Sequence, residues 1–312
     1  MTPTRLQLQL PNLRLSALEY GGDRHGADHP PVLLLHGQAD LAWAMHPVAL
    51  ELAARHRVIS LDLRGHGESD QPGSYGLLQF IGDLAAVVEL LALERPVVVG
   101  HSLGGQIAAQ YCGLFPEVPS ALVVAEGIGP PARVGTGDAA DRLARARNLV
   151  ELAALPMRLR PMADEEEAAT RLAAAHPGLD AERAAFLAHV GTRPAPDGGV
   201  IWRFDPFTRH WLLTHDQDRA EERWANVRCP VLVVTGGQAW ERWWKHQSPG
   251  AKLEGWRGHD PGEVARRVAC FGDVEHRELP DAGHMLPYDA PDALAALIRE
   301  FLERRLPAKN AE

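Results

Sequence analysis

Short runs of branched aliphatic residues alternate along this chain with stretches of helical spacing, and this alternation restricts the fold more than any other feature. The runs lie at residues 32–35, 58–61, 97–99, 122–124 and 231–234, and helical patterns at 43–54, 77–91 and 102–114 lie between them. Runs this short, bounded by turn residues, are typical of strands buried on both faces of a parallel sheet. The alternation therefore predicts a mostly parallel sheet with helices on its faces.

Both ends of the chain fit this scheme, and one internal segment departs from it. Residues 6–10 and 13–20 alternate in polarity and predict an antiparallel hairpin at the sheet edge, and a strand at 274–279 and a helix at 291–305 close the chain. From 129 to 223 no comparable run occurs, and the acidic run at 164–167 indicates a helix start, because acids favour the positive end of the helix dipole. We therefore expect a core of residues 1–128 and 224–312, with a helical cap inserted at 129–223.

Composition excludes several classes of function. The 312 residues carry 41 acids against 32 basic residues, a net charge of −9, which disfavours nucleic acid or an anionic membrane as partner. No apolar run approaches the roughly 18 residues of a membrane span, and the first residues lack the apolar stretch of a signal peptide. Three scattered cysteines form neither a disulfide framework nor a metal-binding pattern. We expect a cytoplasmic protein that acts on a small molecule, and the sequence leaves open whether it forms a homo-oligomer.

A candidate nucleophile lies at the end of the run of three valines. The segment Gly100-His101-Ser102-Leu103-Gly104 is a G-x-S-x-G motif, and a helical pattern follows it. Between a strand and a helix, this motif is typical of a sharp turn that exposes a reactive serine. Glycine is expected two residues before and after the serine, because a side chain there would collide with the neighbouring strand or helix. The sequence therefore predicts that Ser102 is a nucleophile.

Three further segments carry recognisable patterns: the pair His36-Gly37 after the first buried run, the segment LDLRGHGESD at 61–70, and Asp281-Ala282-Gly283-His284 near the C-terminus. Together with the serine motif, and in this order, they resemble the α/β-hydrolase superfamily. The resemblance implies the α/β-hydrolase fold, with a mostly parallel eight-stranded sheet and an inserted helical cap. It implies no metal and no organic cofactor. The segment at 61–70 occurs in relatives of many functions, so we expect local hydrogen bonds there rather than catalysis.

The resemblance also assigns a base and an oxyanion hole. His284 is the expected general base, because it lies in a loop between the last strand and the last helix. The expected oxyanion donors are the backbone N–H groups of Leu103 and Gln38. The side-chain amide of Gln38 either reaches into the substrate pocket or faces solvent. His36 and His66 match family positions that shape loops, and we interpret them as structural.

The catalytic acid departs from the common family pattern. Its usual position, about three residues beyond the glycine after the late strand, holds Ala239. Two substitutes are available, Glu126 at the end of the run at 121–125 and Glu241. A minority of the superfamily, including some haloalkane dehalogenases, places its acid at the end of that earlier strand, so we favour Glu126 and keep Glu241 as the alternative. The competing interpretation of Glu126 is a structural ion pair with an arginine of the insertion.

The predicted function is hydrolysis of a carboxylic ester of a small to medium, largely apolar substrate by a Ser-His-Glu triad through an acyl-enzyme. Gln38, His101, Trp211 and Trp240 are candidate pocket residues, although core packing is the competing role for each tryptophan. Thioesters, lactones, amides and C–C bonds are alternative substrates of the same residues, and a non-catalytic ligand-binding protein is the rival from another class. Epoxide hydrolysis and dehalogenation are disfavoured, because superfamily members with those activities carry an aspartate where Ser102 stands.

Overall fold

The computed structural model describes residues 1–22, 29–130, 138–155, 157–242 and 261–307. Its main feature is an eight-stranded sheet in the order β1-β2-β4-β3-β5-β6-β9-β10, in which every pairing from β4 onward is parallel. The strands are β1 (Thr4–Gln9), β2 (Arg14–Tyr20), β3 (Val32–Leu35), β4 (Val58–Leu61), β5 (Val97–His101), β6 (Ala121–Ala125), β9 (Val231–Gly236) and β10 (Val274–Leu279). The predicted mostly parallel eight-stranded sheet is confirmed.

The antiparallel part of the sheet is the predicted edge hairpin. Strand β1 pairs with β2, and β2 pairs antiparallel with β4, so the hairpin extends the parallel sheet on one side. Along β3, Leu33 and Leu35 pack into one apolar cluster, and Val32 and Leu34 pack into the other. All four are fully buried, as expected for a strand covered on both faces.

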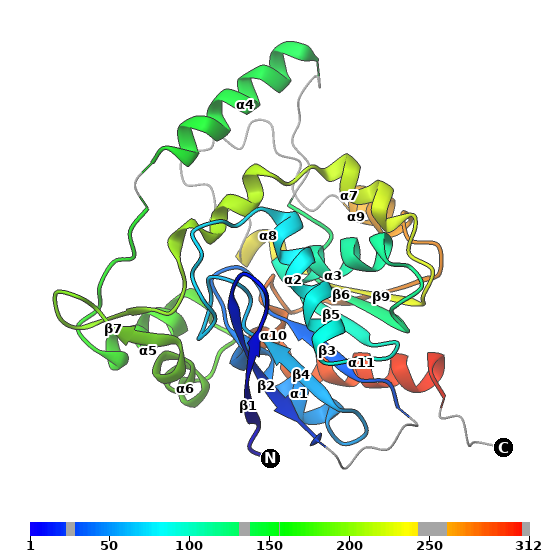
Figure 1. The fold of residues 1–312 in the computed structure, drawn as a ribbon, viewed down its shortest axis with the longest axis horizontal. Helices are drawn as coiled ribbons and strands as arrows, with labels where there is room; N and C mark the ends of the chain where they lie inside the picture. The colour runs from blue at the N-terminus through cyan, green and yellow to red at the C-terminus, as the bar shows by residue number, and fades with distance from the viewer. Residues whose placement is uncertain (23–28, 131–137, 156, 243–260, 308–312) are drawn as a thin grey trace.

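Helices cover the two faces of the sheet (Figure 1). The first cluster is completed by α2 (Leu77–Leu90), α3 (Leu103–Leu114), α7 (Gln217–Trp224) and α9 (Pro261–Val268), and the second by α1 (His46–Leu52) and α11 (Pro291–Arg305). Short helices η2 (Ala42–Met45), α8 (Ala239–Arg242) and α10 (Leu286–Asp289) follow strands β3, β9 and β10. The helix predicted at 43–54 is therefore divided into η2 and α1, and Pro47 lies in the first turn of α1, where its missing N–H costs no hydrogen bond.

The segment between β6 and β9 forms the inserted part. It contains α4 (Ala139–Ala153), α5 (Glu165–Ala175), α6 (Ala181–Gly191), β7 (Thr192–Pro194), β8 (Val200–Trp202) and η3 (Pro206–Leu213) before α7. Asp164 caps α5 by accepting a hydrogen bond from the Glu167 N–H, which confirms the helix start predicted from the acidic run. In Figure 1 helix α4 projects away from the sheet, whereas α7 packs on α3.

Besides its helices, the inserted segment contains a short hairpin that the sequence did not predict. Strands β7 and β8 pair antiparallel, with Thr192 opposite Trp202, and the turn between them holds Gly198 and Gly199 at positive φ. Strands of three residues are too short to show an alternating pattern in the sequence. The division into core and cap stays a prediction, although the buried Ala220 and Trp224 of α7 pack with the core cluster.

Neither a membrane-crossing helix nor a disulfide bond occurs among the described residues. Within them, no helix combines the length and apolar character that a membrane crossing requires. Among them, Cys112, Cys229 and Cys270 are free thiols.

Candidate active site

The candidate nucleophile lies on a strained turn between β5 and α3. Ser102 has φ 52° and ψ −115°, a left-handed conformation that costs a residue with a side chain about 1–3 kcal/mol. A Cβ on Gly100 would lie 2.2 Å from the Gly104 carbonyl oxygen, and a Cβ on Gly104 would lie 2.3 Å from that of Leu35. Gly100 therefore allows helix α3 to approach closely, and Gly104 allows strand β3 to do so. A side chain at either position would prevent this approach, as the sequence predicts.

Ser102, His284 and Glu126 form one hydrogen-bonded series. His284 Nε2 lies 2.9 Å from Ser102 Oγ, and His284 Nδ1 lies 2.9 Å from Glu126 Oε2. They come from the end of β5, the loop after β10 and the end of β6, so three segments far apart in the sequence meet at the carboxyl edge of the parallel strands. The imidazole and the carboxylate are buried, with side chains 2% and 1% exposed. Ser102 is partly exposed.

Both oxygens of Glu126 are used. Oε1 accepts a hydrogen bond of 2.8 Å from the Gly236 N–H at the end of β9, while Oε2 faces the imidazole. Glu126 itself has a positive φ of 50°, and its N–H donates to the Val234 carbonyl at 2.8 Å. Because β6 and β9 are neighbours in the sheet, this arrangement aims the carboxylate across the strand ends at His284. Glu241 lies on α8 with an exposed side chain, so geometry favours Glu126 as the partner of the imidazole.

Burial of His284 favours the neutral form of its imidazole. Desolvation lowers the pKa of His284 below its ordinary value, while the nearby Asp289 carboxylate opposes this effect. A neutral imidazole with Nδ1–H toward Glu126 leaves Nε2 as an acceptor facing Ser102 Oγ, the arrangement required of a general base. His101, beside the nucleophile, is also buried, and its Nε2 lies 2.8 Å from the His284 carbonyl oxygen.

The two expected oxyanion segments lie against each other. Leu103 is the first residue of α3, so no earlier turn of that helix supplies an acceptor for its N–H. Gly37 packs on the nucleophile turn: a Cβ there would lie 3.0 Å from His101 Nδ1 and 3.3 Å from Ser102 Cβ. The Gly104 N–H also donates to the His36 carbonyl at 3.1 Å. The loop that contains Gln38 is thereby held beside Ser102.

The Gln38 side chain is partly buried, and both ends of its amide are hydrogen-bonded to the inserted segment. Its amide nitrogen donates to Thr208 Oγ1 at 2.9 Å, and its amide oxygen accepts from the Trp211 indole N–H at 2.7 Å. Both partners lie on η3 of the inserted segment and are buried, Thr208 fully and Trp211 to 7% exposure. Trp240, the other tryptophan predicted for the pocket, is half-buried on α8. Sequence analysis gave no signal for Thr208, which lies 170 positions from Gln38 and belongs to no motif.

The residues interpreted as structural are held by hydrogen bonds. His36 Nε2 accepts from the Leu63 N–H at 3.1 Å, and His66 Nε2 accepts from the Ala39 N–H at 3.1 Å. In the segment at 61–70, the Asp62 carboxylate accepts from the Ala42 and Glu68 N–H groups. These bonds support the expectation that the segment shapes loops. Among the residues that the structure describes, no group of three or more histidine, cysteine or acidic side chains could hold a metal ion.

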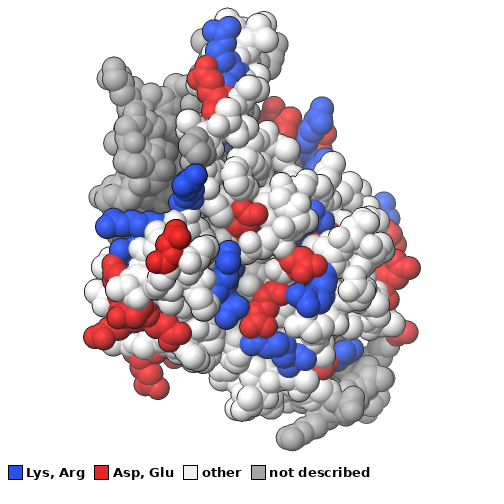
Figure 2. All heavy atoms as spheres, turned by 60° about the vertical axis from the view of Figure 1, so that its left-hand side comes forward, with Lys and Arg blue, Asp and Glu red and all other residues white. Residues whose placement is uncertain are grey.

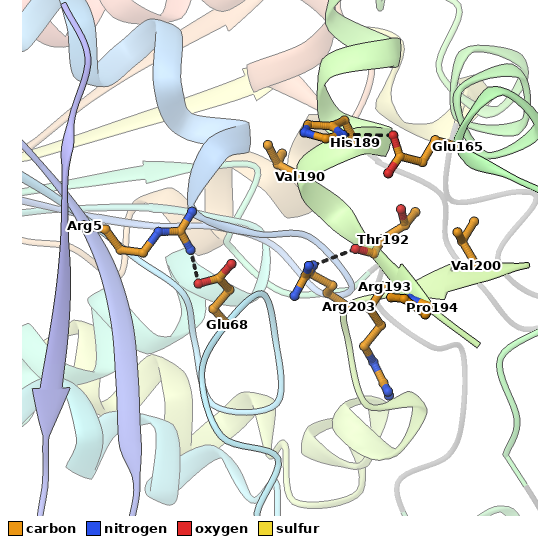
Figure 3. Close-up of a pocket in the computed structure, with 10 residues that line it drawn as sticks. All are labelled: Arg5, Glu68, Glu165, His189, Val190, Thr192, Arg193, Pro194, Val200 and Arg203. Carbon is orange, nitrogen blue, oxygen red and sulfur yellow. Dashed lines mark hydrogen bonds and ion pairs between the residues drawn. The ribbon is translucent and has the colours of Figure 1, made fainter. Parts of the chain in front are cut away.

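A separate cavity of about 310 Å³ lies between the edge hairpin and the insertion (Figure 3). Glu68 pairs with Arg5 there, and Glu165 lies 2.9 Å from His189 Nδ1. Arg203 Nε donates to the Thr192 carbonyl at 2.6 Å. Ser102, Glu126 and His284 do not line this cavity, so it is distinct from the candidate site. On the face drawn in Figure 2, acidic and basic side chains are interspersed over most of the surface, and several acidic side chains lie together at the lower left.

Comparison with known proteins identifies the family. The model of the alpha/beta hydrolase family matches residues 32–297, most of the chain. This protein belongs to the alpha/beta hydrolase family. A serine hydrolase-like protein of Danio rerio is 30% identical to this chain over 298 residues, 92% of this chain and 84% of the relative.

Other curated relatives match this chain over a shorter part. An uncharacterized protein of Mycobacterium tuberculosis is 37% identical over 101 residues, 32% of this chain and 30% of that protein. Epoxide hydrolase 4 of Mus musculus is 37% identical over 98 residues, 30% of this chain and 27% of the enzyme. These alignments span less than a third of the relatives' length. Among solved structures, the thioesterase domain from the curacin biosynthetic pathway has a TM-score of 0.75 and 25% identity, covering 96% of this chain and all of that domain.

Proposed function

We propose that this α/β-hydrolase is a serine hydrolase that cleaves a carboxylic ester of a small to medium, largely apolar substrate. Ser102 is the nucleophile, His284 the general base and Glu126 the residue that orients the imidazole. The backbone N–H groups of Leu103 and Gln38 stabilise the oxyanion. The observation that carries the proposal is the hydrogen-bonded series of Ser102, His284 and Glu126, with both contacts at 2.9 Å.

The reaction proceeds in two steps on these groups. Ser102 Oγ attacks the ester carbonyl carbon and gives its proton to His284 Nε2, while Glu126 stabilises the imidazolium through Nδ1–H. The C–O bond to the alcohol then breaks, and the alcohol takes the proton from Nε2, which leaves Ser102 acylated. His284 next accepts a proton from water, and the water oxygen attacks the acyl carbon. The bond between that carbon and Ser102 Oγ then breaks, Oγ takes the proton back from Nε2, and the carboxylic acid leaves.

The inserted segment supplies the proposed cap over the site. Residues 129–223 leave the sheet at the end of β6, directly beyond Glu126, and η3 contacts the Gln38 loop through Thr208 and Trp211. Apolar and aromatic walls with few polar groups are typical of sites for small apolar ligands. We propose Gln38, His101, Trp211 and Trp240 as residues at or behind this pocket, and we place the protein in the cytoplasm.

Thioester hydrolysis is the second candidate. It uses the same nucleophile, base and oxyanion donors, and the structural similarity to the curacin thioesterase domain favours it over the lactone, amide and C–C alternatives. The serine hydrolase-like name of the Danio rerio relative supports a serine nucleophile for either ester or thioester substrates.

The test measures hydrolysis of p-nitrophenyl esters and matched thioesters of increasing acyl length by the wild type and by Ser102→Ala. We expect turnover that depends on Ser102 and declines once the acyl chain exceeds the pocket. A preference for the thioester series at every length would support the second candidate. Turnover that persists undiminished in Ser102→Ala would refute a serine nucleophile. No turnover of either series, together with tight binding of the intact esters, would favour a non-catalytic ligand-binding protein.

A further inference from the structure

The backbone around Gln38 adopts a conformation that the local sequence does not favour. Ala39 has φ 59°, in the left-handed region that costs a residue with a Cβ about 1–2 kcal/mol. Gly37 is packed against the His101 ring and Ser102 on the preceding side. A strained loop of this kind keeps its shape only where surrounding groups hold it.

Three sets of contacts hold this loop, and they come from different parts of the chain. The Ala39 N–H donates to His66 Nε2, and the Asp40 carboxylate accepts from the Tyr288 hydroxyl at 2.7 Å. The third set is the Gln38 amide, whose two ends are bonded to Thr208 and Trp211. This third set links the predicted oxyanion loop to the inserted segment.

The partners of Gln38 are themselves fixed to the core. Thr208 Oγ1 donates to the Asp205 carbonyl at 2.7 Å, and the Asp205 carboxylate accepts from the Tyr75 hydroxyl at 2.6 Å. The Asp205 N–H donates to the Gly65 carbonyl at 2.8 Å, and the Thr214 hydroxyl accepts from the Leu77 N–H at 3.0 Å. Helix η3 is therefore tied to the core at both of its ends, and it offers Gln38 two partners whose positions are set independently of the loop.

We propose that the Gln38 side chain is a positioning group, which uses Thr208 and Trp211 of the insertion to hold the Gln38 peptide where its N–H meets the oxyanion. The inference rests on the proposed function. The side chain does not touch the substrate carbonyl; it fixes the backbone that does. Helix η3 thus contributes to catalysis indirectly, because two of its side chains form hydrogen bonds that hold the oxyanion loop in place.

The test uses Gln38→Met, which retains the length of the side chain and removes both hydrogen bonds. The first measurement is the second-order rate of labelling by an alkyl fluorophosphonate. In this reaction Ser102 Oγ bonds to phosphorus, fluoride leaves, the serine proton passes to His284, and the phosphoryl oxygen takes the oxyanion position. We expect labelling about 10- to 100-fold slower, because a displacement of about 1 Å in a positioned group can cost 10²-fold. Gln9→Met is the matched control. The Gln9 side chain is exposed on β1, and its one described hydrogen bond goes to the Leu10 carbonyl. The Gln9→Met variant should be labelled at the wild-type rate.

A double-mutant cycle separates positioning from a general loss of packing. Trp211→Phe removes the indole N–H, and Gln38→Met/Trp211→Phe should label no more slowly than Gln38→Met alone, because both changes break the same link. Thr208→Val should slow labelling, and Thr208→Ser should restore most of the rate. For p-nitrophenyl acetate, kcat should fall by a larger factor than KM rises. If Gln38→Met does not fold, the labelling rates of the Thr208 and Trp211 variants test the proposal instead.

The outcomes distinguish the inference from the proposed function. A wild type that fluorophosphonate does not label, or a Ser102→Ala variant labelled as fast as wild type, refutes the serine hydrolase and this inference with it. A wild type labelled at Ser102, with folded Gln38→Met and Thr208→Val variants labelled at the wild-type rate, overturns the positioning role alone. Fully additive losses in the double mutant would also overturn it.

Discussion

Glu126→Gln removes one charge from the candidate site and changes almost nothing in size. In the wild type Oε1 accepts the Gly236 N–H at 2.8 Å, and Oε2 faces His284 Nδ1 at 2.9 Å. The Gly236 N–H can only donate, so the amide oxygen of the glutamine must take the Oε1 position and its NH₂ group must face the imidazole. His284 then has to accept at Nδ1 and carry its proton on Nε2. That tautomer cannot take a proton from Ser102.

The expected loss of kcat is roughly 10³–10⁴-fold, the scale seen when a triad acid is replaced by its amide and the wrong tautomer is imposed. This factor corresponds to about 4–5.5 kcal/mol of transition-state stabilisation at about 1.36 kcal/mol per tenfold. The assay is kcat for the best p-nitrophenyl ester, with the melting temperature of each variant as the measure of folding. Glu241→Gln is the matched control and should retain wild-type turnover, because the exposed Glu241 side chain lies outside the hydrogen-bonded series. A folded Glu126→Gln enzyme of nearly wild-type kcat would refute the reasoning, and loss of activity in Glu241→Gln alone would assign the acid to Glu241.

Two further predictions concern the base and the nucleophile turn. Burial lowers the pKa of His284 below the ordinary histidine value of 6.5, so the imidazole stays neutral as the pH falls through that value. The ratio kcat/KM should therefore stay level from pH 8 to 6.5 and decline only below pH 6.5, and an acid limb centred above pH 6.5 would contradict this. Gly104→Ala should lower the free energy of unfolding measured in urea, because the new Cβ would lie 2.3 Å from the Leu35 carbonyl oxygen. The control is Gly82→Ala on α2, where a new Cβ would meet nothing within 4 Å. This substitution should stabilise the protein by about 1 kcal/mol, because alanine favours a helix more than glycine does. Equal effects of the two substitutions would refute the steric explanation.

Much of the fold follows from patterns within a few residues of one another. Buried strands such as β3 and β4 were predictable because a run of four largely apolar residues between turn residues is too short for a helix and is typical of a strand covered on both faces. The turn at Ser102 was predictable because its G-x-S-x-G motif lies between a strand pattern and a helix pattern, although the close neighbour of Gly104 is the distant Leu35. The hairpin of β7 and β8 was not, because strands of three residues carry too little periodicity to differ from irregular chain.

The candidate site likewise contains residues that the sequence identifies and contacts that depend on the fold. Ser102 and His284 stand in motifs that the sequence displays, so each could be named without knowing where the other lies. The choice between Glu126 and Glu241 depends on the order of strands, since β6 lies beside β9 and brings the Glu126 carboxylate to both Gly236 and the imidazole. The sequence therefore determined which residue types the chemistry uses. Only the tertiary structure decided which acid meets the histidine and that Thr208 and Trp211 meet Gln38, because those contacts join segments more than a hundred residues apart and no local pattern encodes them.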